Sequence, residues 1–366
     1  MESSEPYLPQ EIAELIIEFA GIDGWALLSL CLVSSRFLAL SQRQLYRRID
    51  FIDPGYWDGR PFEDIWKATV DRGTLFLKTI TQHNTSLAQH IHTFNYHNHT
   101  RRDRAFWNLA NKGLRIMSNL KVFTFTSLAP VEIPRLRTLL WKCRFKLEEF
   151  RWNDGEYVDP KGDLAHFLAF QPGLKVLSIT LRDPLPSDTC PRLEKFIGYR
   201  QPMENILRGR FITRLEFIAT AYWWDRSCSQ SYDGIAKELS QLTSLIYGGS
   251  RIQRPDIRPV IPYLKSLQAL HLIGYHCEWE LNHLYKLDEL RVFIWTSAYP
   301  EEEPHYPLKM QIALVPGWFG TMKNLQSVYI NCCKGRHTPK NYLHWTSAGG
   351  DPVTTDPPKH IFDWPM

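Results

Sequence analysis

The chain has 366 residues, of which 44% are hydrophobic and 22% charged, and its formal net charge is +4. This composition is typical of globular proteins and excludes wholesale disorder. The charge is small and evenly spread, so we expect no nucleic-acid partner. No run of about 18 apolar residues occurs, so we expect no membrane partner either.

The seven cysteines are scattered along the chain and odd in number. The first residues are polar and acidic, unlike a signal peptide. We therefore expect a reducing compartment, the cytoplasm or the nucleus. The many aromatic residues (13 Trp, 16 Tyr and 19 Phe) indicate a large core, and a binding face if some of the rings are exposed.

Residues 7–46 predict three short amphipathic helices. Pro9 suits the first turn of a helix, and Ser34 can cap the third. The first helix carries an apolar stripe at helical spacing, formed by Ile12, Leu15, Ile16 and Phe19. The second is so apolar that we expect it to be buried nearly all round, through Leu27, Leu28, Leu30, Cys31 and Val33.

Two interpretations of these helices are open. Their apolar faces could be buried against one another and the rest of the chain, which would make them a cap. Alternatively, the apolar residues left over could form a docking surface, because so small a unit cannot bury a large core by itself.

The order of the residues resembles the F-box, the adaptor-docking module of cullin-type ubiquitin ligases. The resemblance lies in Leu8-Pro9-x-x-Ile12-x-x-x-Ile16, Leu27-Leu28 and Val33-Ser34-x-x-Phe37-x-x-Leu40. It implies that a Skp-type adaptor binds Leu8, Pro9, Ile12, Ile16, Leu28, Val33 and Phe37. One departure is Phe37, where many F-boxes carry Trp.

Behind these helices, a pattern of apolar residues at the first, fourth and sixth positions recurs ten times. Its copies begin at Ile91, Leu120, Leu147, Leu174, Leu193, Ile212, Leu242, Leu267, Leu287 and Leu325. Most intervals lie in or near the range of leucine-rich repeats, about 20–29 residues. Several copies follow a helical stretch, so we expect each unit to pair a strand with a helix and to stack on its neighbours.

The array is irregular, because the Asn or Cys that usually follows the strand of a leucine-rich repeat is mostly missing. An ordinary α/β domain whose buried strands share the pattern is the alternative. We expect an α/β fold: an N-terminal three-helix F-box, then a leucine-rich-repeat-like solenoid with parallel strands on its concave face and helices or loops on its convex face.

The predicted domains are an F-box over residues 5–50, a linker with a helical lead-in over 51–85, the solenoid over 86–335 and a C-terminal tail or cap over 336–366. This arrangement resembles the fungal F-box proteins with irregular leucine-rich repeats. It implies the substrate-recognition subunit of a Skp/cullin/F-box ubiquitin ligase, whose solenoid binds a protein target. A non-catalytic solenoid scaffold unconnected to ubiquitin is the alternative.

The sequence contains none of the common catalytic or nucleotide-binding motifs. We therefore expect no enzyme activity, catalytic residue or cofactor, although a hydrolase hidden in an α/β fold is a third hypothesis. Two sets of residues are weak metal candidates: His90, His92, His97 and His99, and Cys332 and Cys333 with His337. We expect the histidines to lie on the surface or in turns, and no metal site.

Tyr222, Trp223, Trp224 and Arg226 are candidates for binding the target, because aromatic residues and Arg are enriched at interface anchors. A loop tucked against the solenoid is the other interpretation of this segment. Glu301–Glu303 could meet a basic target or form a solvated loop.

Overall fold

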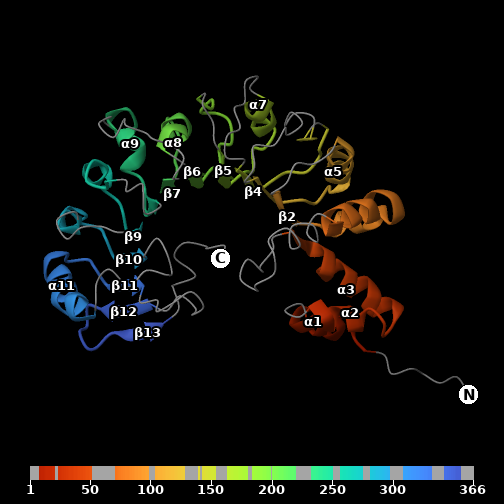
Figure 1. Ribbon diagram of the computed structural model, residues 1–366, viewed down its shortest axis with the longest axis horizontal. Coiled ribbons are helices and arrows are strands. Elements are labelled where there is room, and N and C mark those ends of the chain that lie inside the picture. The colour runs from red at the N-terminus through yellow and green to blue at the C-terminus, as the bar shows by residue number, and fades with distance from the viewer. Residues whose placement is uncertain are drawn as a thin grey trace, which may run out of the picture. The chain divides into compact units, whose positions relative to one another are not determined.

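The computed structural model describes residues 8–20, 24–51, 71–98, 104–127, 139–140, 142–153, 163–179, 184–198, 200–219, 232–249, 256–274, 281–296, 308–331 and 342–355. The chain divides into two compact units, Met1–Leu174 (unit 1) and Lys175–Met366 (unit 2). Figure 1 shows both units and the labels used below.

Unit 1 joins three N-terminal helices to a parallel sheet. Its helices are α1 (Gln10–Ala20), α2 (Gly24–Leu30), α3 (Ser35–Arg47), α5 (Arg104–Ile116) and α7 (Asp163–Ala169), with a helical stretch over residues 71–78 that continues into η1 (Thr79–His83) and η2 (Thr85–His90). Its strands are β1 (Arg48–Phe51), β2 (Thr93–Asn98), β3 (Val122–Ser127) and β4 (Glu149–Asn153). These four strands pair in chain order, all parallel.

Unit 2 repeats the same arrangement over more strands. Its strands are β5 (Val176–Ser178), β6 (Lys195–Gly198), β7 (Arg214–Ala219), β8 (Ser244–Gly249), β9 (Ala269–Ile273), β10 (Val292–Thr296), β11 (Ser327–Asn331), β12 (Tyr342–Thr346) and β13 (Val353–Thr355). Its helices are α8 (Arg200–Leu207), α9 (Ala236–Leu239) and α11 (Leu308–Thr321), with 3-10 turns η3 (Asp233–Ile235), η4 (Ile261–Tyr263) and η5 (Leu284–Lys286). Strands β5 to β11 pair in chain order and parallel.

A backbone ladder holds successive repeats in register. The carbonyl oxygen of His92 accepts the N–H groups of both Lys121 (2.8 Å) and Val122 (2.9 Å). The same two-donor arrangement recurs at the carbonyls of Lys121, Lys175, Glu194, Thr213, Thr243, Gln268 and Arg291. The two donors come directly before or at the first residue of β3, β4 and β6 to β11, so the ladder fixes where these strands begin.

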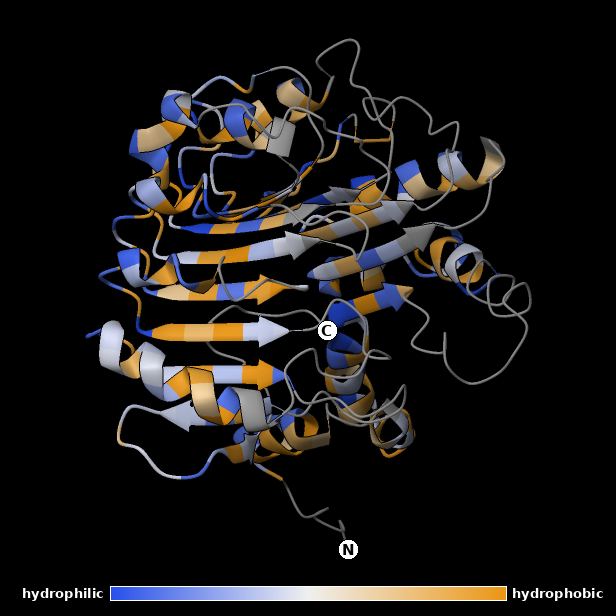
Figure 2. Cartoon of the chain, turned by 60° about the vertical axis from the view of Figure 1, so that its left-hand side comes forward, coloured by the Kyte–Doolittle hydropathy of each residue, from blue (hydrophilic) through white to orange (hydrophobic). Residues whose placement is uncertain are grey.

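Apolar residues of the repeats fill the face of the sheet that the helices cover. In unit 1 they are aromatic: Phe94, Phe123 and Phe150 lie in one row across β2, β3 and β4, with ring centroids about 6 Å apart. In unit 2 the corresponding positions are mostly aliphatic, among them Leu245 and Leu270, which are fully buried. Figure 2 shows the hydrophobic residues running along the strands.

The expectation of an α/β fold with mostly parallel strands and stacked strand-and-helix units is confirmed. One register in the predicted array is wrong. Val292 pairs with Ala269 and Phe293 with Leu270, so the repeat that contains β10 begins at Leu290 and not at Leu287. Both leucines satisfy the same spacing, and only the pairing with β9 distinguishes them.

Three strands were not recognised in the sequence. β1 follows α3 with no intervening residue. β12 and β13 are antiparallel and extend the sheet beyond β11. They lie within the residues predicted to form a C-terminal tail or cap.

The face of the unit 2 sheet that the helices do not cover is also buried around β8 to β12. Ile246, Ala269, Ile294 and Tyr342 form a second hydrophobic cluster there. Gly248 lies close to this cluster, and a Cβ on it would come within 2.5 Å of Ile273. The cluster is therefore as tightly packed as a core, although it lies opposite the helices.

A buried chain of hydrogen bonds crosses this cluster. The Thr296 hydroxyl lies 2.7 Å from His271 Nε2 and 2.8 Å from the Tyr342 hydroxyl. It joins three strands, β9, β10 and β12, and so attaches the antiparallel end of unit 2 to its parallel strands.

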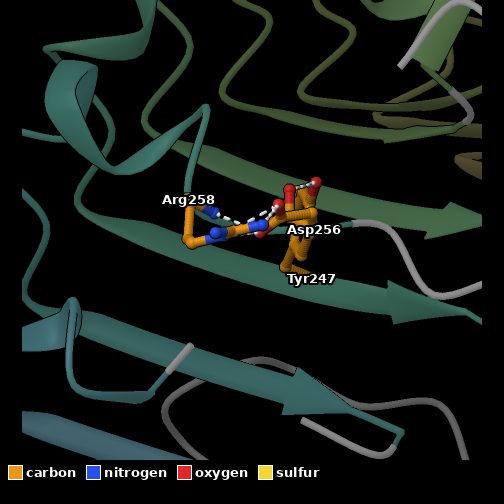
Figure 3. A network of polar contacts seen from close by, with 3 residues as sticks. All are labelled: Tyr247, Asp256 and Arg258. Atoms are coloured by element: carbon orange, nitrogen blue, oxygen red, sulfur yellow. Dashed lines mark hydrogen bonds and ion pairs between the residues drawn. The ribbon is translucent and has the colours of Figure 1, made fainter. Parts of the chain in front are cut away.

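A second polar network holds the segment that follows β8 (Figure 3). The Tyr247 hydroxyl donates to the carbonyl of Asp256 (3.0 Å), and the Asp256 carboxylate accepts from the Arg258 guanidinium and backbone. Burial by itself raises the pKa of this carboxyl, but the hydrogen bonds and the charge of Arg258 outweigh it and hold the pKa below the usual 3.8.

Replacing Tyr342 by Phe should loosen the antiparallel end of unit 2. It removes one buried hydrogen bond and should lower the free energy of unfolding by about 1 kcal/mol. Amide exchange across β12 should rise. Tyr263→Phe is the matched control, because the Tyr263 hydroxyl bonds Asp233 at an exposed position (2.7 Å). Equal losses in both variants would contradict a special role for the buried chain.

The Asp256 carboxyl should titrate below 3.8 in NMR, and Arg258→Gln should bring its pKa back toward that value. Because the folded-state pKa is depressed, the network stabilises the fold above about pH 3.8 and loses that contribution as the pH falls through the folded-state pKa. An unchanged pKa in Arg258→Gln would show that Arg258 is not the cause.

Candidate docking face on the N-terminal helices

α1 turns most of its apolar residues to solvent. Its buried side chains are Ala13 and Ile17, one turn apart on a single face. The predicted stripe of Ile12, Leu15, Ile16 and Phe19 is exposed. The stripe therefore exists as the spacing predicts, but the described residues leave it open to solvent.

α2 shows the same division. Leu27 is 3% exposed, whereas its neighbour Leu28 is 50% exposed. Trp25, 80% exposed, lies at i−3 from Leu28 and so on the same face of α2, and Leu32, 89% exposed, follows in the turn after the helix. The expectation that this segment is buried nearly all round is wrong, because the described neighbours α1 and α3 bury Leu27 but leave Leu28 and Val33 exposed.

α3 begins as predicted, with the Ser34 hydroxyl accepting the N–H of Phe37 (3.3 Å). The Arg36 guanidinium donates to the carbonyl of Leu8 (2.6 Å). This hydrogen bond connects the residues that precede α1 to the first turn of α3. Val33 and Leu38 are exposed, and Phe37 is half-buried. These contacts hold the three helices together without covering their outer side chains.

The seven predicted adaptor-binding residues thus lie in one small helical module. Five are exposed: Pro9, Ile12, Ile16, Leu28 and Val33. Leu8 and Phe37 are half-buried. We call the exposed apolar residues of the module the docking face; they are Ile12, Leu15, Ile16, Phe19, Trp25, Leu28, Leu32, Val33 and Leu38.

The most exposed of them, Phe19, Trp25 and Leu32, were not among the predicted site residues. The signal in the sequence was the i,i+3 spacing of Trp25 and Leu28, which puts two large apolar side chains on one face of α2. Soluble proteins rarely expose apolar residues so close together unless the surface binds something.

The other candidate residues contribute less. Tyr222, Trp223, Trp224 and Arg226 lie outside the described residues, as do Glu301–Glu303 and the Cys332, Cys333 and His337 set. Of the histidine cluster, the side chains of His90 and His92 are described, and both are half-buried. Among the residues whose positions the structure gives, no three His, Cys, Asp or Glu side chains are grouped so that they could hold a metal ion.

Burial lowers the pKa of both histidines, and nearby positive charges lower it further. For His90 the charge is that of Arg43. For His92 the charges are those of Arg47, Lys121 and His90. Each imidazole is thus surrounded by cations rather than by carboxylates.

Comparison with protein-family models finds no match to this chain, and comparison with curated protein sequences finds none either. In the described parts of the chain, no helix is long and apolar enough to cross a bilayer.

The adjacent leucines of α2 offer a direct test of this geometry. Leu27→Ala should lower the free energy of unfolding by about 2–5 kcal/mol, because it opens a cavity in the module. Leu28→Ala should change it by less than about 0.5 kcal/mol, because it removes an exposed side chain. Urea denaturation followed by circular dichroism measures both, and comparable losses would mean that Leu28 is covered.

Proposed function

We propose that this chain is the substrate-recognition subunit of a Skp/cullin/F-box ubiquitin ligase. In this proposal the docking face binds a Skp-type adaptor, and the repeats bind the protein target. The observation that carries the proposal is the exposure of large apolar side chains on all three N-terminal helices, at positions that resemble the F-box pattern.

The division of apolar side chains in α1 and α2 into a buried and an exposed set supports the proposal. Small or inward residues such as Ala13 and Leu27 hold the module together, while the larger apolar set faces outward. A cap that only closed the end of an array would bury that set instead. The exposed aromatic side chains of Phe19 and Trp25 are of the kind that dominates binding energy at protein interfaces.

The role proposed for the chain is positioning. Ubiquitin transfer would be performed by partner enzymes, and this chain would raise the rate by holding a target close to them. The proposal therefore needs no catalytic residue or cofactor in this chain. It places the protein in the cytoplasm or the nucleus, where such ligases work.

Co-purification with a recombinant Skp-type adaptor tests the proposal. The wild-type chain should retain the adaptor, and Leu28→Glu should weaken binding at least about tenfold, because a carboxylate would be buried in an apolar interface. Leu8→Ala combined with Pro9→Ala should also weaken it. Isothermal titration calorimetry gives the affinities.

Leu75→Glu is the matched control, since Leu75 is an exposed leucine of unit 1 outside the three helices. It should leave adaptor binding unchanged. Failure of the wild-type chain to bind the adaptor, or equal binding by wild type and Leu28→Glu, would exclude the proposal. A stable monomer with no adaptor affinity would favour the alternative, a solenoid scaffold unconnected to ubiquitin.

A further inference from the structure

Basic side chains from three separate segments gather on unit 1. Arg43 and Arg47 lie one turn apart on α3 and so share a helical face. The N–H of His92 donates to the carbonyl of Arg47 (2.9 Å), and the carbonyl of His92 accepts the N–H of Lys121 (2.8 Å). His90 ends η2, which packs against α3. We call these five residues, Arg43, Arg47, His90, His92 and Lys121, the basic patch.

The two arginines of the patch have no acidic partner in the described part of the chain. Both are exposed. Lys121 alone is paired, with Glu148 at 2.6 Å on the side of β4. Arg43 and Arg47 therefore repel each other at i,i+4, and no described carboxylate is paired with either of them.

The pKa values of the two histidines also report positive charge around them. Arg43 acts on His90, and Arg47 and Lys121 act on His92, which lowers the pKa of both imidazoles after burial has done so. The five groups thus lie close enough to interact electrostatically. An anion placed among them would meet two guanidiniums suited to bidentate carboxylate or phosphate contacts.

We infer that the basic patch is a binding surface for an acidic segment of a protein partner. Charge complementarity carries the inference: cations from α3, the end of η2 and the residue before β3 converge, and among the described residues the ion pairs of this region are Lys121 with Glu148 and Arg48 with Asp50, neither of which includes Arg43 or Arg47. It goes beyond the proposed function and does not depend on it, because the patch is separate from the docking face and needs no ubiquitin ligase.

A polypeptide is a better occupant than a nucleic acid. The patch has three permanent cations, Arg43, Arg47 and Lys121, and two histidines whose pKa burial and the neighbouring cations lower from the usual 6.5. Non-specific nucleic-acid binding depends on neutralising many phosphates along a stripe, and the whole chain has a net charge of only +4. A short run of carboxylates, or one phosphorylated side chain among them, matches the size of the patch.

Fluorescence anisotropy with three labelled probes tests the inference on the full chain. The probes are a twelve-residue glutamate-rich peptide, a peptide of the same length with two phosphoserines, and a single-stranded oligonucleotide of matched charge. We expect either peptide to bind the wild-type chain more tightly than the oligonucleotide. Binding should weaken as salt rises from 50 to 300 mM, because the contacts are ionic.

The decisive variant is Arg43→Glu with Arg47→Glu, which should weaken peptide binding at least about tenfold. Its matched control is Lys78→Glu with Lys112→Glu. These lysines are exposed on helical segments of unit 1, and the change in net charge is the same. Arg43→Gln with Arg47→Gln keeps the helix free of new carboxylates and should show an intermediate loss.

Three results would overturn the inference: no binding of either peptide at 50 mM salt, equal weakening in both double charge reversals, or tighter binding of the oligonucleotide. Circular dichroism of each variant checks that the helices remain. If the Glu pair unfolds the chain, the Gln pair decides, because glutamine is a good helix former. Adaptor binding by the Arg43→Gln, Arg47→Gln variant is measured alongside, and its retention separates this surface from the docking face.

Discussion

The carbonyl group that precedes each strand is the acceptor on which the repeats depend. It takes the N–H groups of two consecutive residues in the next repeat, from His92 in unit 1 to Arg291 in unit 2. Since an unpaired backbone group is costly when buried, the arrangement fixes each strand relative to the last. It also fixes which side chains face the helices.

Given that register, the two units fill their cores differently. Unit 1 stacks aromatic rings across neighbouring strands, as in Phe125 against Trp152 at 4.4 Å between centroids. Unit 2 has aliphatic residues at most positions equivalent to Phe94, such as Leu245 and Leu270, and adds a second cluster on the other side of the sheet, around Ile246 and Ile294. Both solutions satisfy the same pattern, because the pattern specifies apolar character and not shape.

The last of the N-terminal helices runs directly into the first strand of the sheet. α3 ends at Arg47 and β1 begins at Arg48, and the carbonyl of Arg47 is itself an acceptor for the next repeat. Within unit 1 the module that bears the docking face is therefore continuous with the sheet. A rigid junction of this kind suits a protein proposed to hold a target at a defined distance from a partner. The basic patch lies at this junction, so a partner there would contact both the helices and the repeats.

The sequence by itself determined the elements and their order. The spacing of apolar residues predicted three helices and parallel strands, and Ser34 marked the start of α3. These features are local, because periodicity and capping involve residues only a few positions apart. The predicted docking residues are local in the same sense: four of the seven, Ile12, Ile16, Leu28 and Phe37, lie within the three helices.

Only the tertiary structure decided which side chains of those elements are buried, which are exposed, and in which register the strands pair. Periodicity cannot tell an apolar stripe that meets a neighbour from one that meets solvent, so the burial of Leu27 and the exposure of Leu28 depended on where α1 and α3 pack. The start of the β10 repeat at Leu290 depended on pairing with β9. The basic patch depended on folding most of all, because Arg43, His90 and Lys121 are far apart in a sequence whose charges are evenly spread, and only the backbone ladder brings their segments side by side.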